Sequence, residues 1–181
     1  MRSDSLGDVR RRALLRKLAA LGIAAQGGFF AAASRAAALR VGSPAPPATL
    51  VTLDGNHIAT SDLLGRVVLL TFWATWCAPC RQELPLLSSY ATEYAAKGLT
   101  ILGFALDAHE DLPKVRKMAQ ALAFPSGLVA DSSLPGYGRI WHIPVNFTID
   151  RQGLLYQNGW GDKDATWTAE RFSRIVLPLL S

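Results

Sequence analysis

Two apolar runs without alternation, residues 67–72 and 99–106, dominate the pattern of hydrophobic and polar positions. Such runs are typical of central strands that are covered on both faces. Between them, apolar residues recur every three or four positions from residue 78 to about residue 96, which predicts a helix. This order predicts two parallel strands joined by a crossover helix.

Weaker patterns flank this unit. Residues 49–53 and 56–59, separated by Asp54-Gly55, predict an N-terminal β-hairpin. The other predicted elements are a helix over residues 112–122, a short strand over 128–130, an antiparallel hairpin over 146–149 and 154–157, and a helix over 168–177. The order predicts an α/β fold in which a central mixed sheet has helices on both faces.

Basic charge is concentrated at the N-terminus. Residues 1–40 hold eight Arg and Lys and two Asp, which leaves 11 basic and 12 acidic residues in the remainder. The net charge of +5 therefore comes from the tail. Because the rest of the chain has no excess of basic residues, nucleic acid is excluded as a partner. The basic stretch RRRALLRK at residues 10–17 precedes a mildly apolar stretch at residues 18–33, a combination that predicts a secretory signal.

The same tail allows two interpretations. The Arg11-Arg12 pair resembles a twin-arginine signal, although Arg10 stands where that signal usually has Ser or Thr. An N-terminal membrane anchor is the alternative, but the apolar stretch spans only about 24 Å as a helix, against a hydrocarbon core of about 30 Å. We therefore expect export to the periplasm or cell envelope, which are oxidising compartments, and a folded domain over residues 41–181.

The chain has two cysteines, Cys77 and Cys80, directly after the first apolar run. The spacing puts Cys77 at a helix N-terminus, where the helix dipole favours a thiolate. A disulfide closing so small a loop stabilises a fold by about 2 kcal/mol, which is poor placement for a structural staple. Half of a zinc site would need further ligands, and the three histidines lack ligand spacing. The pair therefore predicts redox chemistry without a metal or a cofactor.

The active-site stretch resembles a known family. Residues 73–85, WATWCAPCRQELP, are similar to the active site of the TlpA-like and ResA-like thiol:disulfide oxidoreductases of bacterial cell envelopes, which have the thioredoxin fold. The resemblance continues to the C-terminus and includes PVNFTID at residues 144–150. It implies a thioredoxin-like domain in which Cys77, exposed at the helix start, exchanges disulfides with a partner and Cys80 resolves the mixed disulfide.

Glu83 is the third predicted catalytic residue. It lies three residues after Cys80 on the same helix face, so an acid there can accept and return the protons of the cysteines. Cytoplasmic thioredoxins have a buried Asp at the place that matches Thr71, and Glu83 is the carboxylate best placed to replace it. A solvated helix carboxylate is the competing interpretation, because position alone does not show burial.

A partner-binding surface is implied by the same resemblance. Pro144 matches the family's cis-proline, so the backbone of Ile143 would pair with an extended partner peptide. A plain trans proline at the entry of the strand is the competing interpretation. Trp76 is predicted to lie beside the sulfurs as part of this surface. Asp107 is predicted to be an ordinary loop or cap residue. His142 is predicted to be a surface or satisfied loop histidine, with a role in partner specificity as the alternative.

The leading hypothesis is an exported enzyme that reduces disulfides of envelope proteins, with apocytochromes c or copper-site proteins as clients and a membrane electron donor. Ala78-Pro79 lacks the His that would stabilise the thiolate, which favours a reductant over an oxidant. A Cu(I) carrier that uses both thiolates is the alternative, although no third ligand lies close in sequence. A thiol peroxidase would need Pro-x-x-x-Thr-x-x-Cys, which is absent before Cys77.

Overall fold

The computed structural model describes residues 39–162 and 165–181. The signal peptide or anchor predicted over residues 1–40 therefore lies outside the described residues, apart from its last two positions. Within the described part of the chain, no helix combines the length and the apolar character that crossing a membrane requires.

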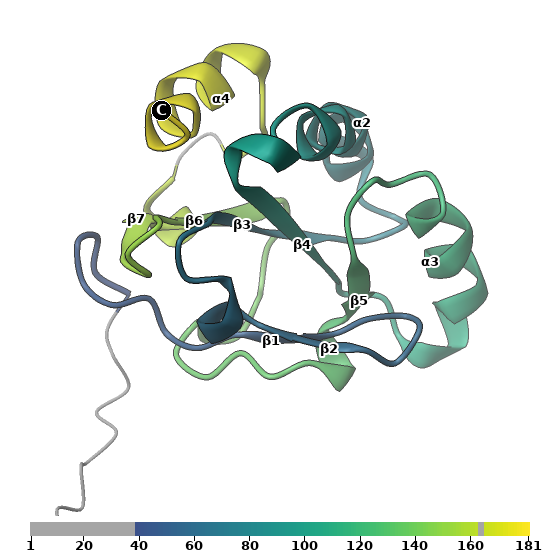
Figure 1. The fold of residues 1–181 in the computed structure, drawn as a ribbon. Coiled ribbons are helices and arrows are strands. Elements are labelled where there is room, and N and C mark those ends of the chain that lie inside the picture. Colours follow the sequence, from purple (N-terminus) through teal and green to yellow (C-terminus); the bar gives the residue numbers. More distant parts are fainter. Residues whose placement is uncertain (1–38, 163–164) are drawn as a thin grey trace, which may run out of the picture. The chain divides into compact units, whose positions relative to one another are not determined.

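A mixed sheet of five strands, in the order β5-β4-β3-β6-β7, forms the centre of the described residues (Figure 1). The strands are β3 (Val67–Trp73), β4 (Leu99–Ala105), β5 (Ser126–Leu128), β6 (Val145–Ile149) and β7 (Leu155–Gln157). Central β3 pairs in parallel with β4 and antiparallel with β6. All seven residues of β3 are buried, as a run that is apolar except for Thr71 predicts.

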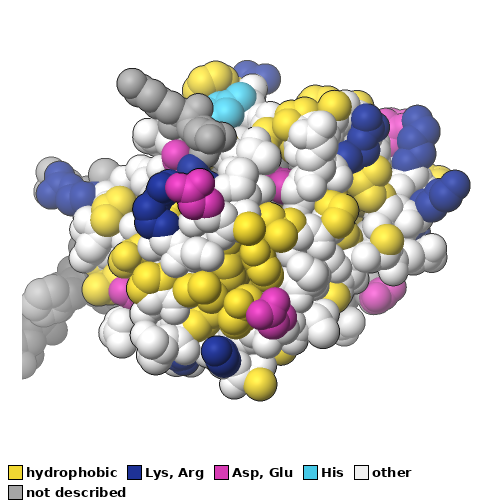
Figure 2. Space-filling model, turned by 90° about the horizontal axis from the view of Figure 1, so that it is seen from above, with side chains coloured by type: hydrophobic (Ala, Val, Ile, Leu, Met, Phe, Trp, Pro, Cys, Tyr) yellow, Lys and Arg dark blue, Asp and Glu magenta, His cyan; other side chains and the backbone are white. Residues whose placement is uncertain are grey.

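The helices α2 (Ala78–Glu93) and α4 (Ala169–Ile175) lie over one face of this sheet, and α3 (Leu112–Ala119) lies beyond β5 (Figure 1). Residues from all three helices pack into one apolar cluster with the alternate residues of β3. Seen from the side of α2 and α4, apolar side chains gather in the middle and charged side chains lie around them (Figure 2). Beneath that surface, α2 packs on the sheet through the apolar cluster.

The opposite face is covered by the hairpin of β1 (Thr49–Val51) and β2 (His57–Ala59), which forms a separate two-stranded sheet. Leu50 of β1 packs there against alternate β3 residues and the buried ring of Tyr137. The hairpin lies so close to β5 that a Cβ on Gly127 would be 1.8 Å from the Val51 carbonyl oxygen. Only glycine permits this approach.

The predicted α/β class, with a mixed sheet, helices and an N-terminal hairpin, is confirmed. The helices were expected on both faces, but α2, α3 and α4 all contribute to the cluster on one face, and the hairpin packs on the other. The weak strand predicted over residues 128–130 was placed two residues too late, since β5 covers residues 126–128 and a 3-10 turn follows. Ser126 and Gly127 have low strand propensity, but pairing with β4 decides their conformation. The helix predicted over residues 112–122 ends at Ala119.

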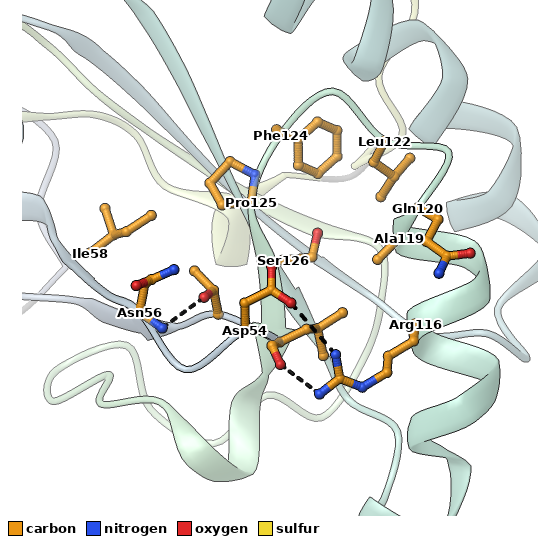
Figure 3. Close-up of a pocket in the computed structure, with 12 residues that line it drawn as sticks. Asp54, Asn56, Ile58, Arg116, Ala119, Gln120, Leu122, Phe124, Pro125 and Ser126 are labelled. Atoms are coloured by element: carbon orange, nitrogen blue, oxygen red, sulfur yellow. Dashed lines mark hydrogen bonds and ion pairs between the residues drawn. The ribbon is translucent and has the colours of Figure 1, made fainter.

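A hollow of about 430 Å³ lies between the hairpin and α3 (Figure 3). Arg116 from α3 reaches across it, donates to the Leu53 carbonyl at 2.6 Å and pairs with Asp54 at 3.8 Å. None of the six predicted site residues lines this hollow. The candidate chemistry lies elsewhere, at the edge of the sheet where β3 ends.

Candidate active site

The two cysteines form a disulfide at the start of α2, with their Cα atoms 5.3 Å apart. Cys77 is the N-cap of this 16-residue helix, and its sulfur accepts a hydrogen bond from the Cys80 N–H at 3.2 Å. An N–H group and the positive end of the helix dipole therefore favour negative charge on the Cys77 sulfur. The local sequence produces this arrangement, because buried β3 ends at Trp73 and Pro79 suits a first helical turn.

The exposure of Cys77 differs from the expectation. Its side chain is only 5% exposed and Cys80 is completely buried, and both belong to the apolar cluster beneath α2. The prediction of an exposed Cys77 is thus wrong for the disulfide form, in which the bond holds the first sulfur against the buried second one. Cys77 is still the more accessible of the two.

The loop before Cys77 is held by an acid that sequence reasoning undervalued. Asp107 is 4% exposed, and its carboxylate accepts hydrogen bonds from the backbone N–H of Thr75 at 3.0 Å and from the Thr75 hydroxyl. Arg81 of α2 donates to the Thr75 carbonyl at 3.0 Å. Asp107 is therefore a buried anchor of the active-site loop and not an ordinary loop residue. The sequence did offer a signal for this role, because Asp107 directly follows the predicted parallel strand 99–106 and functional residues of such sheets lie at the carboxyl ends of the strands.

The Ile143-Pro144 peptide bond is cis, as the resemblance implies. Val145 pairs with Phe72 near the end of β3, so Pro144 lies at the sheet edge from which the chain continues to Cys77. Ile143 packs against the apolar cluster that contains both cysteines. Trp76, next to Cys77, is 64% exposed. The predicted partner-binding residues therefore lie at the same edge of the sheet as the disulfide.

Aromatic rings precede the cis bond. The Trp141 and Trp160 rings are nearly parallel with centres 5.9 Å apart, and His142 packs edge-on against both. Trp141 is 74% exposed, whereas the Nδ1 atom of His142 is buried and has no hydrogen-bond partner among the described residues. His142 is thus half-buried and packs against two indole rings, which the loop interpretation did not anticipate.

Glu83 is buried on α2, with 1% of its surface exposed. Its Oε2 accepts a hydrogen bond of 2.7 Å from the backbone N–H of Trp167. Burial raises the pKa of Glu83 from its ordinary 4.5 to about 7, while the Trp167 N–H, the Asn146 and Thr71 side chains and the Arg171 charge act to lower it. A carboxyl group with this pKa exchanges protons readily near neutral pH.

Two groups near Glu83 were missed at the sequence level. Asn146 lies directly across from Thr71 in the β3 and β6 pairing, and both side chains are completely buried. Arg171 forms an ion pair with Asp162 and lies over the Trp167 ring at 5.1 Å. In the sequence, only the polar amide of Asn146, in a strand whose other residues are apolar apart from Thr148, hinted at a function.

A model of the AhpC/TSA family matches residues 41–157. The chain belongs to this family. Among the relatives of this AhpC/TSA member, thiol-disulfide oxidoreductase ResA of Bacillus anthracis is 32% identical over 146 residues, which cover 80% of this chain and 82% of that protein. ResA of Geobacillus thermodenitrificans (strain NG80-2) is 34% identical over 145 residues, 78% of this chain and 80% of that protein.

Solved structures of enzymes with the same kind of chemistry also resemble this chain. A thiol:disulfide interchange protein of Chlorobium tepidum TLS has a TM-score of 0.64 and 30% identity, and the match covers 78% of this chain and 98% of that one. A secreted Mycobacterium tuberculosis disulfide oxidoreductase homologous to E. coli DsbE has a TM-score of 0.59 and 26% identity, covering 72% and 95%. This AhpC/TSA family member is a thiol-disulfide oxidoreductase with a thioredoxin-like fold.

Proposed function

We propose that this enzyme is exported and reduces disulfides in proteins of the cell envelope, with Cys77, Cys80 and Glu83 as its catalytic residues. Its clients are apocytochromes c, during cytochrome c maturation, or proteins whose paired cysteines bind copper. The reduced enzyme gives two electrons to each client disulfide. A membrane electron donor then reduces the Cys77–Cys80 disulfide again.

The exchange has two steps. The Cys77 thiolate attacks one sulfur of the client disulfide, which forms a mixed disulfide and releases the other client sulfur as a thiolate. Cys80 then loses its proton to Glu83 and attacks the Cys77 sulfur, which releases the second client thiolate and leaves the enzyme oxidised. Glu83 returns its proton when the enzyme is reduced again.

The buried carboxyl of Glu83, on the same helix face as Cys80, is the observation that carries this proposal. Cys80 is completely buried, so water has little access to its proton. Glu83 is three residues away on α2 and has a pKa of about 7, between the ordinary pKa of a carboxyl and that of a thiol. A base of this strength can take the proton from Cys80 and still give it back near neutral pH.

Client binding is assigned to Trp76, Ile143 and Pro144. Support comes from their common location at the sheet edge beside the disulfide and from the exposed indole of Trp76. An extended client segment would pair with the Ile143 backbone, as in strand addition. Export is supported by the basic N-terminal tail and by the secreted relative from M. tuberculosis.

Trapping tests the assignment of the two cysteines. A Cys80→Ser variant cannot resolve the mixed disulfide, so we expect client proteins linked to Cys77 when cells are quenched with acid and analysed by non-reducing electrophoresis and mass spectrometry. The matched control is the Cys77→Ser, Cys80→Ser double variant, which should trap nothing. Absence of any trapped envelope protein would count against the proposal.

The reduction potential tests the direction of electron flow. Equilibration of the purified protein with glutathione or dithiothreitol gives the potential of the Cys77–Cys80 pair. A value well below about −200 mV, on the side of thioredoxin, supports a reductase. A value near that of the strong oxidant DsbA, about −120 mV, contradicts it.

A further inference from the structure

Asn146 and Thr71 form a polar pair inside the sheet. They lie directly opposite each other on β6 and β3, so their side chains point to the same face. Leu69 and Trp73, the alternate neighbours of Thr71, pack into the cluster beneath α2, which identifies that face as the one covered by Glu83. A buried polar pair beneath a buried carboxyl is costly unless the three groups interact.

Three oxygen atoms in this region lack a hydrogen-bond partner among the described residues: Thr71 Oγ1, Glu83 Oε1 and Asn146 Oδ1. They come from β3, α2 and β6, which no short sequence segment brings together. When Glu83 is ionised, its carboxylate only accepts hydrogen bonds, so the Thr71 hydroxyl and the Asn146 amide are the donors that β3 and β6 offer to it. Such bonds are stronger to a carboxylate than to a neutral carboxyl.

Asn146 also contacts the segment that supplies the other donor. Its Nδ2 donates to the Ala165 carbonyl at 2.8 Å, two residues before the Trp167 N–H that binds Glu83 Oε2. Gly159 lies on the Asn146 backbone so closely that a Cβ there would be 2.3 Å from the Asn146 carbonyl oxygen. Asn146 is therefore in contact with the C-terminal segment on both sides of residues 163–164.

We propose that Asn146, assisted by Thr71, is the positioning residue of Glu83, which it holds in place and whose ionised form it stabilises. One amide hydrogen serves the carboxyl, and the other holds Ala165 so that the Trp167 N–H meets Oε2. This inference rests on the proposed role of Glu83 in proton exchange. In that role, Asn146 keeps the proton affinity of Glu83 low enough for the carboxyl to release its proton at neutral pH.

Few charged groups influence the pKa of Glu83. The sheet contributes only the uncharged side chains of Thr71 and Asn146. The C-terminal segment contributes Arg171, which is paired with Asp162. Among the described residues, no charged group of α2, Arg81 included, acts on the pKa of Glu83, and the two cysteines do not titrate while they form a disulfide. The oxidised protein thus allows Glu83 to be titrated without interference from the thiols.

Carbon-13 NMR of the full chain, labelled at the glutamate carboxyl groups and kept oxidised, measures the titration midpoint of Glu83. We expect a midpoint near 7 in the unaltered protein. Asn146→Leu keeps a similar volume but removes the amide, and it should raise the midpoint by about one pH unit, a tenfold increase in proton affinity. Thr71→Val should raise it by less, and Asn146→Thr, which restores a donor, should bring it back toward 7.

Thr148→Val is the matched control, because it removes a buried hydroxyl from the same strand and face, where Thr148 Oγ1 donates to Gln157 instead. Its Glu83 midpoint should equal that of the unaltered protein. An unchanged or lowered midpoint in Asn146→Leu and Thr71→Val, or an equal rise in Thr148→Val, overturns the proposal. If Asn146→Leu does not fold, Thr71→Val against Thr148→Val decides alone. No client takes part, so this result is independent of the trapping experiment.

Discussion

Replacing Glu83 by Gln should make the fold more stable at neutral pH. A carboxyl whose pKa is higher in the folded than in the unfolded chain binds its proton more tightly when folded, so the stability falls as the pH rises between the two values. For Glu83 these values are 4.5 and about 7, and each pKa unit corresponds to about 1.4 kcal/mol. The ionised carboxylate therefore costs the folded protein about 3 kcal/mol above pH 7.

The variant keeps the structural contact and removes only the charge. The side-chain amide oxygen that Glu83→Gln introduces can still accept the Trp167 N–H, which binds Oε2 at 2.7 Å in the unaltered protein. Because Glu83 is 1% exposed, solvent screening does not reduce the effect appreciably. We expect equal stability of the two proteins near pH 4.5 and an advantage of about 3 kcal/mol for Glu83→Gln at pH 8.

Urea unfolding of the oxidised proteins at several pH values between 4.5 and 8 measures this difference. Glu93→Gln is the matched control, since Glu93 is at the end of the same helix and exposed, and its pH dependence should follow that of the unaltered protein. Parallel stability curves for Glu83→Gln and the unaltered protein would refute the reasoning. They would mean that the buried, ionised carboxylate does not destabilise the folded state.

Two further predictions concern the frame of the site. Asp107→Ala removes the acceptor of two hydrogen bonds from the active-site loop and should lower the free energy of unfolding, measured in urea, by about 2 kcal/mol. Asp54→Ala, whose ion pair is exposed, should lower it far less. An equal loss of stability in the two variants would contradict the role of Asp107 as an anchor of the loop. Gly127→Ala places a Cβ 1.8 Å from the Val51 carbonyl oxygen and should cost about 2 kcal/mol or more in the same assay, whereas Gly161→Ala meets nothing within 4 Å. Equal stabilities of these two variants would exclude the close packing of the hairpin on β5.

The strong apolar runs of the sequence predicted the centre of the fold correctly. Residues 67–72 and 99–106 became β3 and β4, and the three-to-four spacing after Cys80 became α2. These signals are local, since each is a repeat of side chains along a single element. Elements whose conformation depends on neighbours were predicted less well, as with β5, where Ser126 and Gly127 are extended because β4 pairs with them.

By itself, the sequence determined the reactive pair. Two cysteines at the junction of a buried strand and a helix are adjacent in the chain, so their spacing and their place at a helix N-terminus follow from local structure alone. Only the tertiary structure decided the state of the third residue. Glu83 is buried, and its carboxyl is bound by a backbone group 84 residues away. The pKa of a carboxyl depends on what surrounds it, and those surroundings are assembled by folding.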